Sequence, residues 1–179
     1  KIPYFKELGI TTVELMPVNE FSEVIMQEMG PENPLSVDKP TGKINYWGYA
    51  PGYFFAPKAA YSSGKKSPAE EFKALVKAMH KEGLELIVEL FFSGKETPSF
   101  VLDAVRFWAG EFHVDGVHLV GDPPLDIISR DPFLSRIKVF APSWEGKSGG
   151  KRKHLGEYND GFLVDMRRAL KGDEDQLKA

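Results

Sequence analysis

Residues 111–122 read EFHVDGVHLVGD, and this stretch indicates how the rest of the chain is built. An Asp-Gly turn leads into a β-branched, apolar run, and the breaker GDPP at residues 121–124 ends it, which predicts a short buried strand. Strand alternation divides the run between two faces, His118 with Val120 on one and Val117 with Leu119 on the other. In a parallel sheet, side chains from several strands converge at the carboxyl ends of the strands.

Strand and helix signals alternate on both sides of this stretch. Strands are expected at residues 11–16, 84–92, 117–120 and 137–141, and helices at residues 2–8, from 68 to Gly83, from 98 onward, at 125–136 and at 160–171. The clearest helix start is Ser67-Pro68-Ala69-Glu70, which has the residues of a capping box. The pattern predicts an α/β fold with parallel strands, either doubly wound or part of a (β/α)8 barrel.

Three segments lack a regular pattern. Residues about 20–44 contain three X-Pro breakers and are interpreted as a long loop excursion within a single domain that spans residues 1–179. Residues 46–55 are dense in aromatic and turn residues, and they suit either a platform for sugar rings or packing beneath a loop. Residues 146–154 are rich in Gly and Lys but lack the spacing of a phosphate-binding loop, so we expect a solvated loop there.

The composition excludes several classes of protein. The chain has 179 residues, 42% of them hydrophobic, and a net charge of −3, which indicates neither a nucleic-acid-binding nor a membrane-binding surface. With no cysteine, disulfides and thiolate metal sites are excluded, which fits an intracellular compartment such as the cytoplasm or a plastid. The chain starts within a helix and carries no signal segment, so we expect it to be part of something longer.

Carboxylates at strand ends are the first candidates for chemistry. Glu14, Glu89 and Asp122 are each expected at or near the carboxyl end of a strand, and glycosyl transfer needs two carboxyl groups in different protonation states. The alternative is that the two glutamates only accept structural hydrogen bonds and that Asp122 is a turn residue. His113 and His118 fall on opposite faces of an extended segment, so we expect no metal site and no cofactor.

Six blocks of the chain, in order, resemble consecutive blocks of the α-amylase superfamily, glycoside hydrolase family 13, and of its isoamylase, pullulanase and glycogen-debranching members above all. They are KIPYFKELGITTVELMPVNEF, NYWGYAPGYFFAPKAAYSS, EFKALVKAMHKEGLELIVELFF, VLDAVRFWAGEFHVDGVHLV, DPFLSRIKVFAPSWEG and GEYNDGFLVDMRRALKGDE. The resemblance implies a partial (β/α)8 barrel that runs from about the first helix to the sixth strand and helix. It places the block with the family's transition-state-stabilising Asp outside this chain.

The resemblance fails at the catalytic positions. The family's G-F-R-F-D block falls on residues 116–120, where Val120 replaces the nucleophile and His118 replaces the arginine. Its A-E-P-W block falls on residues 141–144, where Pro142 replaces the acid/base glutamate. Its D-V-V-x-N-H block falls on residues 89–94, where only the acidic Glu89 remains. The nearest carboxylates, Asp122 and Glu145, are displaced from the family positions by two and three residues.

The resemblance implies that the binding side of the groove remains. We therefore expect no catalytic residue but predict a substrate-binding set of Tyr49, Trp47, Trp144, Glu89 and His118. The resulting hypothesis is a catalytically degenerate debranching-type domain that binds α-glucan or supports a catalytically active homologous subunit. Two alternatives stay open: an active glucan hydrolase whose carboxylates lie elsewhere, and a structural barrel that binds no glucan.

Overall fold

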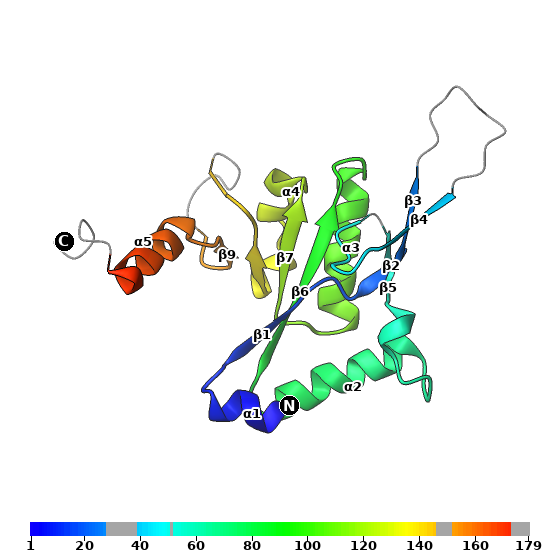
Figure 1. The fold of residues 1–179 in the computed structure, drawn as a ribbon, viewed down its shortest axis with the longest axis horizontal. Coiled ribbons are helices and arrows are strands. Elements are labelled where there is room, and N and C mark those ends of the chain that lie inside the picture. The colour runs from blue at the N-terminus through cyan, green and yellow to red at the C-terminus, as the bar shows by residue number, and fades with distance from the viewer. Residues whose placement is uncertain (28–38, 51, 146–151, 173–179) are drawn as a thin grey trace.

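A parallel sheet of five strands forms the centre of the molecule (Figure 1). The computed structural model describes residues 1–27, 39–50, 52–145 and 152–172. The sheet contains β1 (Thr12–Leu15), β6 (Glu85–Phe92), β7 (Gly116–Gly121), β8 (Lys138–Phe140) and β9 (Leu155–Gly156) in this order. The spatial order follows the chain order without reversing, whereas a doubly wound sheet reverses at a switch point. The fold is therefore a partial (β/α) barrel.

In the described part of the chain, five α-helices and two short 3-10 helices accompany the sheet. They are α1 (Ile2–Glu7), η1 (Ala59–Tyr61), α2 (Pro68–Lys81), α3 (Pro98–Glu111), α4 (Leu125–Ser129), η2 (Leu134–Arg136) and α5 (Asp160–Lys171). The predicted capping box at the start of α2 is confirmed, because the Ser67 side chain accepts from the Glu70 N–H and the Glu70 carboxylate accepts from the Ser67 N–H. No helix of the described residues is long and apolar enough to cross a membrane.

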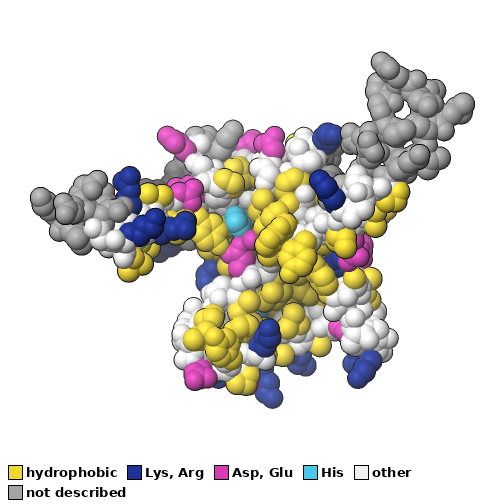
Figure 2. Space-filling view, viewed as in Figure 1, with side chains coloured by type: hydrophobic (Ala, Val, Ile, Leu, Met, Phe, Trp, Pro, Cys, Tyr) yellow, Lys and Arg dark blue, Asp and Glu magenta, His cyan; other side chains and the backbone are white. Residues whose placement is uncertain are grey.

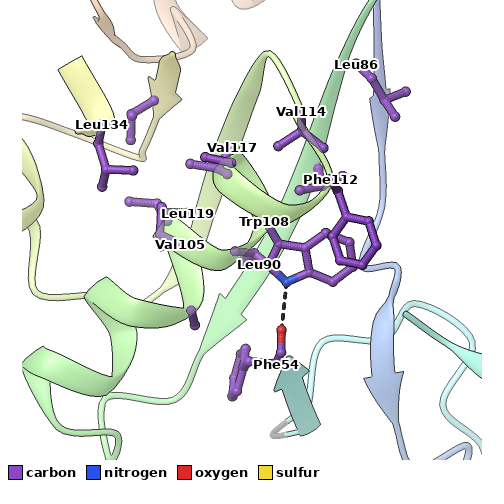
Figure 3. Close-up of a cluster of buried hydrophobic side chains, with 14 of the residues drawn as sticks. Phe54, Leu86, Leu90, Val105, Trp108, Phe112, Val114, Val117, Leu119 and Leu134 are labelled. Atoms are coloured by element: carbon purple, nitrogen blue, oxygen red, sulfur yellow. Dashed lines mark hydrogen bonds between the residues drawn. The ribbon is translucent and has the colours of Figure 1, made fainter. Parts of the chain in front are cut away.

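The hydrophobic core lies between one face of the sheet and helices α2 and α3, and Figure 3 shows the part of this core around Trp108. Val117 and Leu119 point into it and are fully buried, as the alternation of β7 predicts, whereas His118 and Val120 on the other face are only partly buried. Trp108 of α3 is also fully buried, and its indole N–H donates to the Phe54 carbonyl at 2.7 Å. This hydrogen bond therefore attaches the aromatic residues 46–55 to the core beside the sheet.

A glycine ends β7 where that strand meets β6. Gly121 has a φ of +88°, and a Cβ added to it would lie 2.1 Å from the Phe92 carbonyl oxygen. Any other side chain would clash with the backbone of β6. The breaker GDPP at residues 121–124 thus begins with a glycine because the ends of β6 and β7 lie close together there.

Two small antiparallel pairs lie beside the sheet and correct the prediction of an irregular excursion. β2 (Asn19–Phe21) pairs with β5 (Gly52–Pro57), and β3 (Val24–Gln27) pairs with β4 (Lys39–Ile44). These strands carry bulges and a proline at residue 40, so they show none of the regular alternation that identifies a strand. Of the predicted excursion, residues 28–38 lie outside the described part of the chain.

One further prediction needs correction. The single helix expected at residues 125–136 is divided into α4 and η2, because Pro132 has no N–H and disfavours helical geometry before it. Strand β9 was not predicted, since two residues carry no periodic signal. Helix α5 forms as expected, but Phe162, Met166 and Leu170 on its apolar stripe are exposed. Of the loop expected at residues 146–154, residues 146–151 lie outside the described part.

Candidate functional site

Three polar side chains from three neighbouring strands meet on the open face of the sheet. Glu89 of β6 and His118 of β7 are direct partners in the parallel register. Glu14 of β1 pairs with Ile87, which precedes Glu89 by two residues and therefore shares its face. Sheet geometry thus brings together residues that lie far apart in the sequence, and we call Glu14, Glu89 and His118 the Glu–His cluster.

His118 lies between the two carboxylates of the Glu–His cluster. Its Nδ1 is 2.7 Å from Glu14 Oε1 and 3.8 Å from Glu89 Oε1. A tyrosine hydroxyl donates to the other oxygen of each carboxylate: Tyr49 to Glu89 Oε2 at 2.6 Å, and Tyr158 to Glu14 Oε2. The Oε1 atom of each glutamate therefore faces the histidine, and each Oε2 atom is held by a tyrosine.

Aromatic rings border this cluster. The Tyr49 ring lies 6.1 Å from that of Phe91, and the Tyr158 ring lies 5.1 Å from His118 and 5.9 Å from Phe140. Figure 2 shows a histidine beside acidic side chains in the middle of one face, with hydrophobic side chains around them. Tyr49 and Tyr158 remain exposed to 42% and 55% while their hydroxyl groups are bound, so their rings are fixed and accessible.

The two glutamates have different acidities. The hydrogen bond from His118 lowers the pKa of Glu14 despite partial burial, and the Tyr158 hydroxyl lowers it further. Burial raises the pKa of Glu89, and the neighbouring Glu14 adds to this although the Tyr49 hydroxyl opposes it. Burial and the Glu89 carboxylate raise the pKa of Tyr49 to about 12, so it stays a hydrogen-bond donor near neutral pH. Glu89 is thus the glutamate that retains a proton more readily.

The two predicted tryptophans lie in different surroundings. Trp47 is 58% exposed and its ring meets that of Tyr46 edge to face, so a ligand can reach it. Trp144 is only 8% exposed, and its indole N–H donates to the Gly156 carbonyl at 2.8 Å. Little of the Trp144 ring is open to a sugar, and its role in binding stays a prediction.

The two positions that the resemblance aligns with the family's catalytic carboxylates, residues 120 and 142, carry none. Val120 is partly buried on the same face of β7 as His118, two residues closer to the carboxyl end. Pro142 is exposed and lines a hollow of about 530 Å³ together with Asp122 and Gly94. Asp122 packs against Gly94 there and forms no ion pair with the cluster among the described residues, so the structure unites only two of the three candidate carboxylates.

Sequence reasoning missed Tyr158 and the meeting of Glu14 with His118. Tyr158 follows the unpredicted strand β9, so its position at the cluster had no periodic signal. Glu14 and His118 are 104 residues apart, and only the order of the strands brings them together. The other histidine with a carboxylate partner among the described residues is His80, whose Nε2 lies 2.7 Å from Asp115 Oδ2 at a separate place.

Comparisons with known proteins identify relatives of the chain, although no family model matches it. A glycogen debranching enzyme of Serratia proteamaculans is 32% identical over 238 residues, covering 96% of this chain and 34% of that protein. Isoamylase SU1, chloroplastic, of Zea mays is 25% identical, and its alignment covers 96% of this chain and 32% of that protein. The chain thus spans about a third of the length of these relatives.

Solved structures identify the fold. A pullulanase from Paenibacillus barengoltzii, crystallised with maltohexaose and α-cyclodextrin, superposes with a TM-score of 0.63 at 18% identity, over 96% of this chain and 34% of that one. Pullulanase type I from Bacillus subtilis, complexed with maltose, superposes with a TM-score of 0.57 at 22% identity, over 98% of this chain and 31% of that one. Fold and strand order therefore define part of a TIM barrel like that of these pullulanases. More narrowly, the chain belongs to the α-amylase superfamily, glycoside hydrolase family 13, and to its isoamylase and pullulanase type.

Proposed function

We propose that this chain is a catalytically degenerate debranching-type domain that binds α-glucan. The single observation that carries the proposal is the open face of the sheet, where hydrogen-bonding groups and fixed aromatic rings persist around a position occupied by Val120. The relatives are named for glycogen debranching, and one solved neighbour holds maltohexaose. These names support a starch- or glycogen-type ligand for this chain as well.

The loss of catalysis follows from side-chain chemistry. A retaining glycosidase needs a carboxylate that forms a glycosyl ester and a second carboxyl group that transfers a proton. Valine at residue 120 and proline at residue 142 can do neither. Glu14 and Glu89 lie on β1 and β6 and both face the same imidazole nitrogen, so neither stands at residue 120 or 142.

Glucan binding has a physical basis in Tyr49. Its ring offers a flat apolar face to the CH face of a sugar, and its hydroxyl is anchored on Glu89 at 2.6 Å, so the ring is held before a ligand arrives. Trp47 nearby in the sequence is exposed and offers a second ring. The carboxylates of the Glu–His cluster can accept hydrogen bonds from sugar hydroxyls.

Native gel electrophoresis in amylopectin tests this proposal. We expect the protein to be retarded, Tyr49→Ala to migrate as in a gel without glucan, and Tyr4→Ala to keep the retardation. Tyr4 is a matched control because it is 57% exposed on α1, which precedes β1 and so lies toward the amino ends of the strands. Unretarded native protein, or equal retardation of both variants, would contradict the proposal and favour a purely structural barrel.

The proposal extends to a catalytically active homologous subunit as a partner and to an intracellular location. A domain that binds glucan without cleaving it can hold substrate for an active relative, and plant relatives are named as chloroplastic. The test is co-purification with a debranching enzyme from the source cell. Loss of this co-purification on addition of excess maltohexaose would indicate a bridge through glucan, whereas its persistence would indicate a direct contact.

A second candidate function is an active hydrolase with relocated carboxylates. The observation in its favour concerns the pKa values of the two glutamates. The pKa of Glu14 is lowered and that of Glu89 is raised, as in pairs of carboxyl groups that divide the acid and base roles. Release of reducing sugar that disappears in Glu89→Gln would support this candidate over the first.

A further inference from the structure

We propose that Glu14, Glu89 and His118 form a binding site for one divalent transition-metal ion, with Zn²⁺ as the best fit. Each residue offers one ligand atom, and the three atoms lie within 4.8 Å of one another. The set combines one imidazole nitrogen with two carboxylate oxygens, a mixture that suits Zn²⁺ better than Ca²⁺ or Mg²⁺, which prefer oxygen alone. The inference does not depend on whether the chain binds glucan.

The spacing of the ligand atoms fits a small ion. Zn²⁺ lies about 2.0–2.2 Å from nitrogen and oxygen ligands, so tetrahedral neighbours are about 3.3 Å apart. His118 Nδ1 is 2.7 Å from one glutamate oxygen and 3.8 Å from the other, which brackets that separation. Small side-chain rotations would make room for the ion, which would replace the hydrogen bond between His118 and Glu14.

The tyrosines around the cluster supply an independent second observation. Tyr49 and Tyr158 bind the outer Oε2 atoms, which leaves both Oε1 atoms directed at His118 Nδ1. In metal sites, hydrogen bonds from neighbouring residues fix the orientation of the ligating side chains. An ion bound to the Oε1 atoms would keep both tyrosine contacts intact.

The charge balance of the cluster also favours a cation. Three other carboxylates have a Lys or Arg partner: Glu20 has Lys58, Glu85 has Lys138 and Asp131 has Arg106. Within the described residues, no Lys or Arg forms an ion pair with Glu14 or Glu89, whose side chains are only 24% and 12% exposed. Two adjacent carboxylates in such a place repel one another, and a divalent ion would compensate both.

The expectation of no metal site rested on histidine pairs alone. His118 lies on the open face and meets two glutamates from other strands. Three protein ligands leave at least one coordination position for water or a ligand. The site would therefore be of the open kind that exchanges its fourth ligand.

Zn²⁺ uptake by tag-free protein tests the proposal. After removal of metal with EDTA, the protein is dialysed against Zn²⁺ and the bound metal is measured by mass spectrometry, with far-UV circular dichroism confirming the fold. We expect one Zn²⁺ per chain, loss of uptake in His118→Asn, and unchanged uptake in the control His80→Asn, which removes a histidine paired with a single carboxylate.

Tyr158→Phe keeps the ring and all three ligands, and we expect it to weaken Zn²⁺ binding about tenfold or more through the lost outer hydrogen bond. This variant decides the matter if His118→Asn does not fold. Absence of uptake by the native protein, or equal Zn²⁺ affinity in native protein, His118→Asn and Tyr158→Phe, would overturn the proposal.

Discussion

The two faces of strands β6 and β7 differ sharply although their residues alternate along the same backbone. Leu90, Val117 and Leu119 point toward the helices and are fully buried in the core. Glu89 and His118 point the other way, stay partly exposed, and form hydrogen bonds or ion pairs with one another and with residues of two other segments. The comparison teaches that one face supplies stability and leaves the other free for the proposed binding, so substitutions one residue apart should have different consequences.

The largest expected effect lies on the packed face. Leu119→Ala should lower the free energy of unfolding by about 3 kcal/mol, because it removes a fully buried side chain and leaves a cavity. Urea denaturation measures this change, and Val120→Ala on the other face serves as the comparison, with an expected loss below about 1 kcal/mol. Equal losses in both variants would break the division between the faces.

The next effect concerns a buried carboxylate at the edge of the core. Burial alone would raise the pKa of Asp131, but the Arg106 guanidinium and the Leu134 N–H outweigh it and hold the pKa below its usual value. Asp131→Asn should therefore cost about 2 kcal/mol at neutral pH. The exposed Asp103, 3.8 Å from the same arginine, is a matched control whose Asn variant should cost less than about 0.5 kcal/mol.

The pH dependence of the Asp131 contribution has a definite sign. Because the pKa is lower in the folded state, the stabilisation is complete above the unfolded-state value of about 3.9 and is lost as pH falls through the folded-state value. The difference in unfolding free energy between native protein and Asp131→Asn should thus shrink when urea titrations are repeated at lower pH. A difference that grows with acidity would contradict the assignment.

A smaller effect on the open face separates the ring of Tyr49 from its hydroxyl. Tyr49→Phe keeps the stacking surface but removes the hydrogen bond to Glu89, so glucan affinity should fall by no more than about tenfold. Affinity electrophoresis over a series of amylopectin concentrations measures it. Complete loss of retardation in Tyr49→Phe would mean that the hydroxyl rather than the ring carries the binding.

The smallest expected effect is at residue 120, which the family resemblance aligns with the nucleophile. Val120→Asp restores a carboxylate on the open face, but Pro142 still leaves no proton donor, so we expect no hydrolysis of pullulan. A reducing-sugar assay at high protein concentration checks this. Activity in the single variant would show that another group already serves as acid/base.

The sequence predicts the repetitive parts of the fold and misses those that depend on contacts between distant segments. The β7 alternation and the capping box of α2 are local patterns, and both are confirmed. The pairing of β3 with β4 and the two-residue strand β9 have no local period, because long-range hydrogen bonds define them. The sequence shows Glu14, Glu89 and His118 as separate residues, and only the strand register places them in contact.

Reducing-sugar release from amylopectin and pullulan by the purified protein, with an active debranching enzyme as control, tests the central claim most directly. We predict that the native protein releases no reducing sugar at any concentration while it is retarded by amylopectin in a native gel. Release that survives repurification and disappears in Glu89→Gln, Asp122→Asn or Glu145→Gln would contradict the claim and identify an active glycosidase with relocated carboxylates.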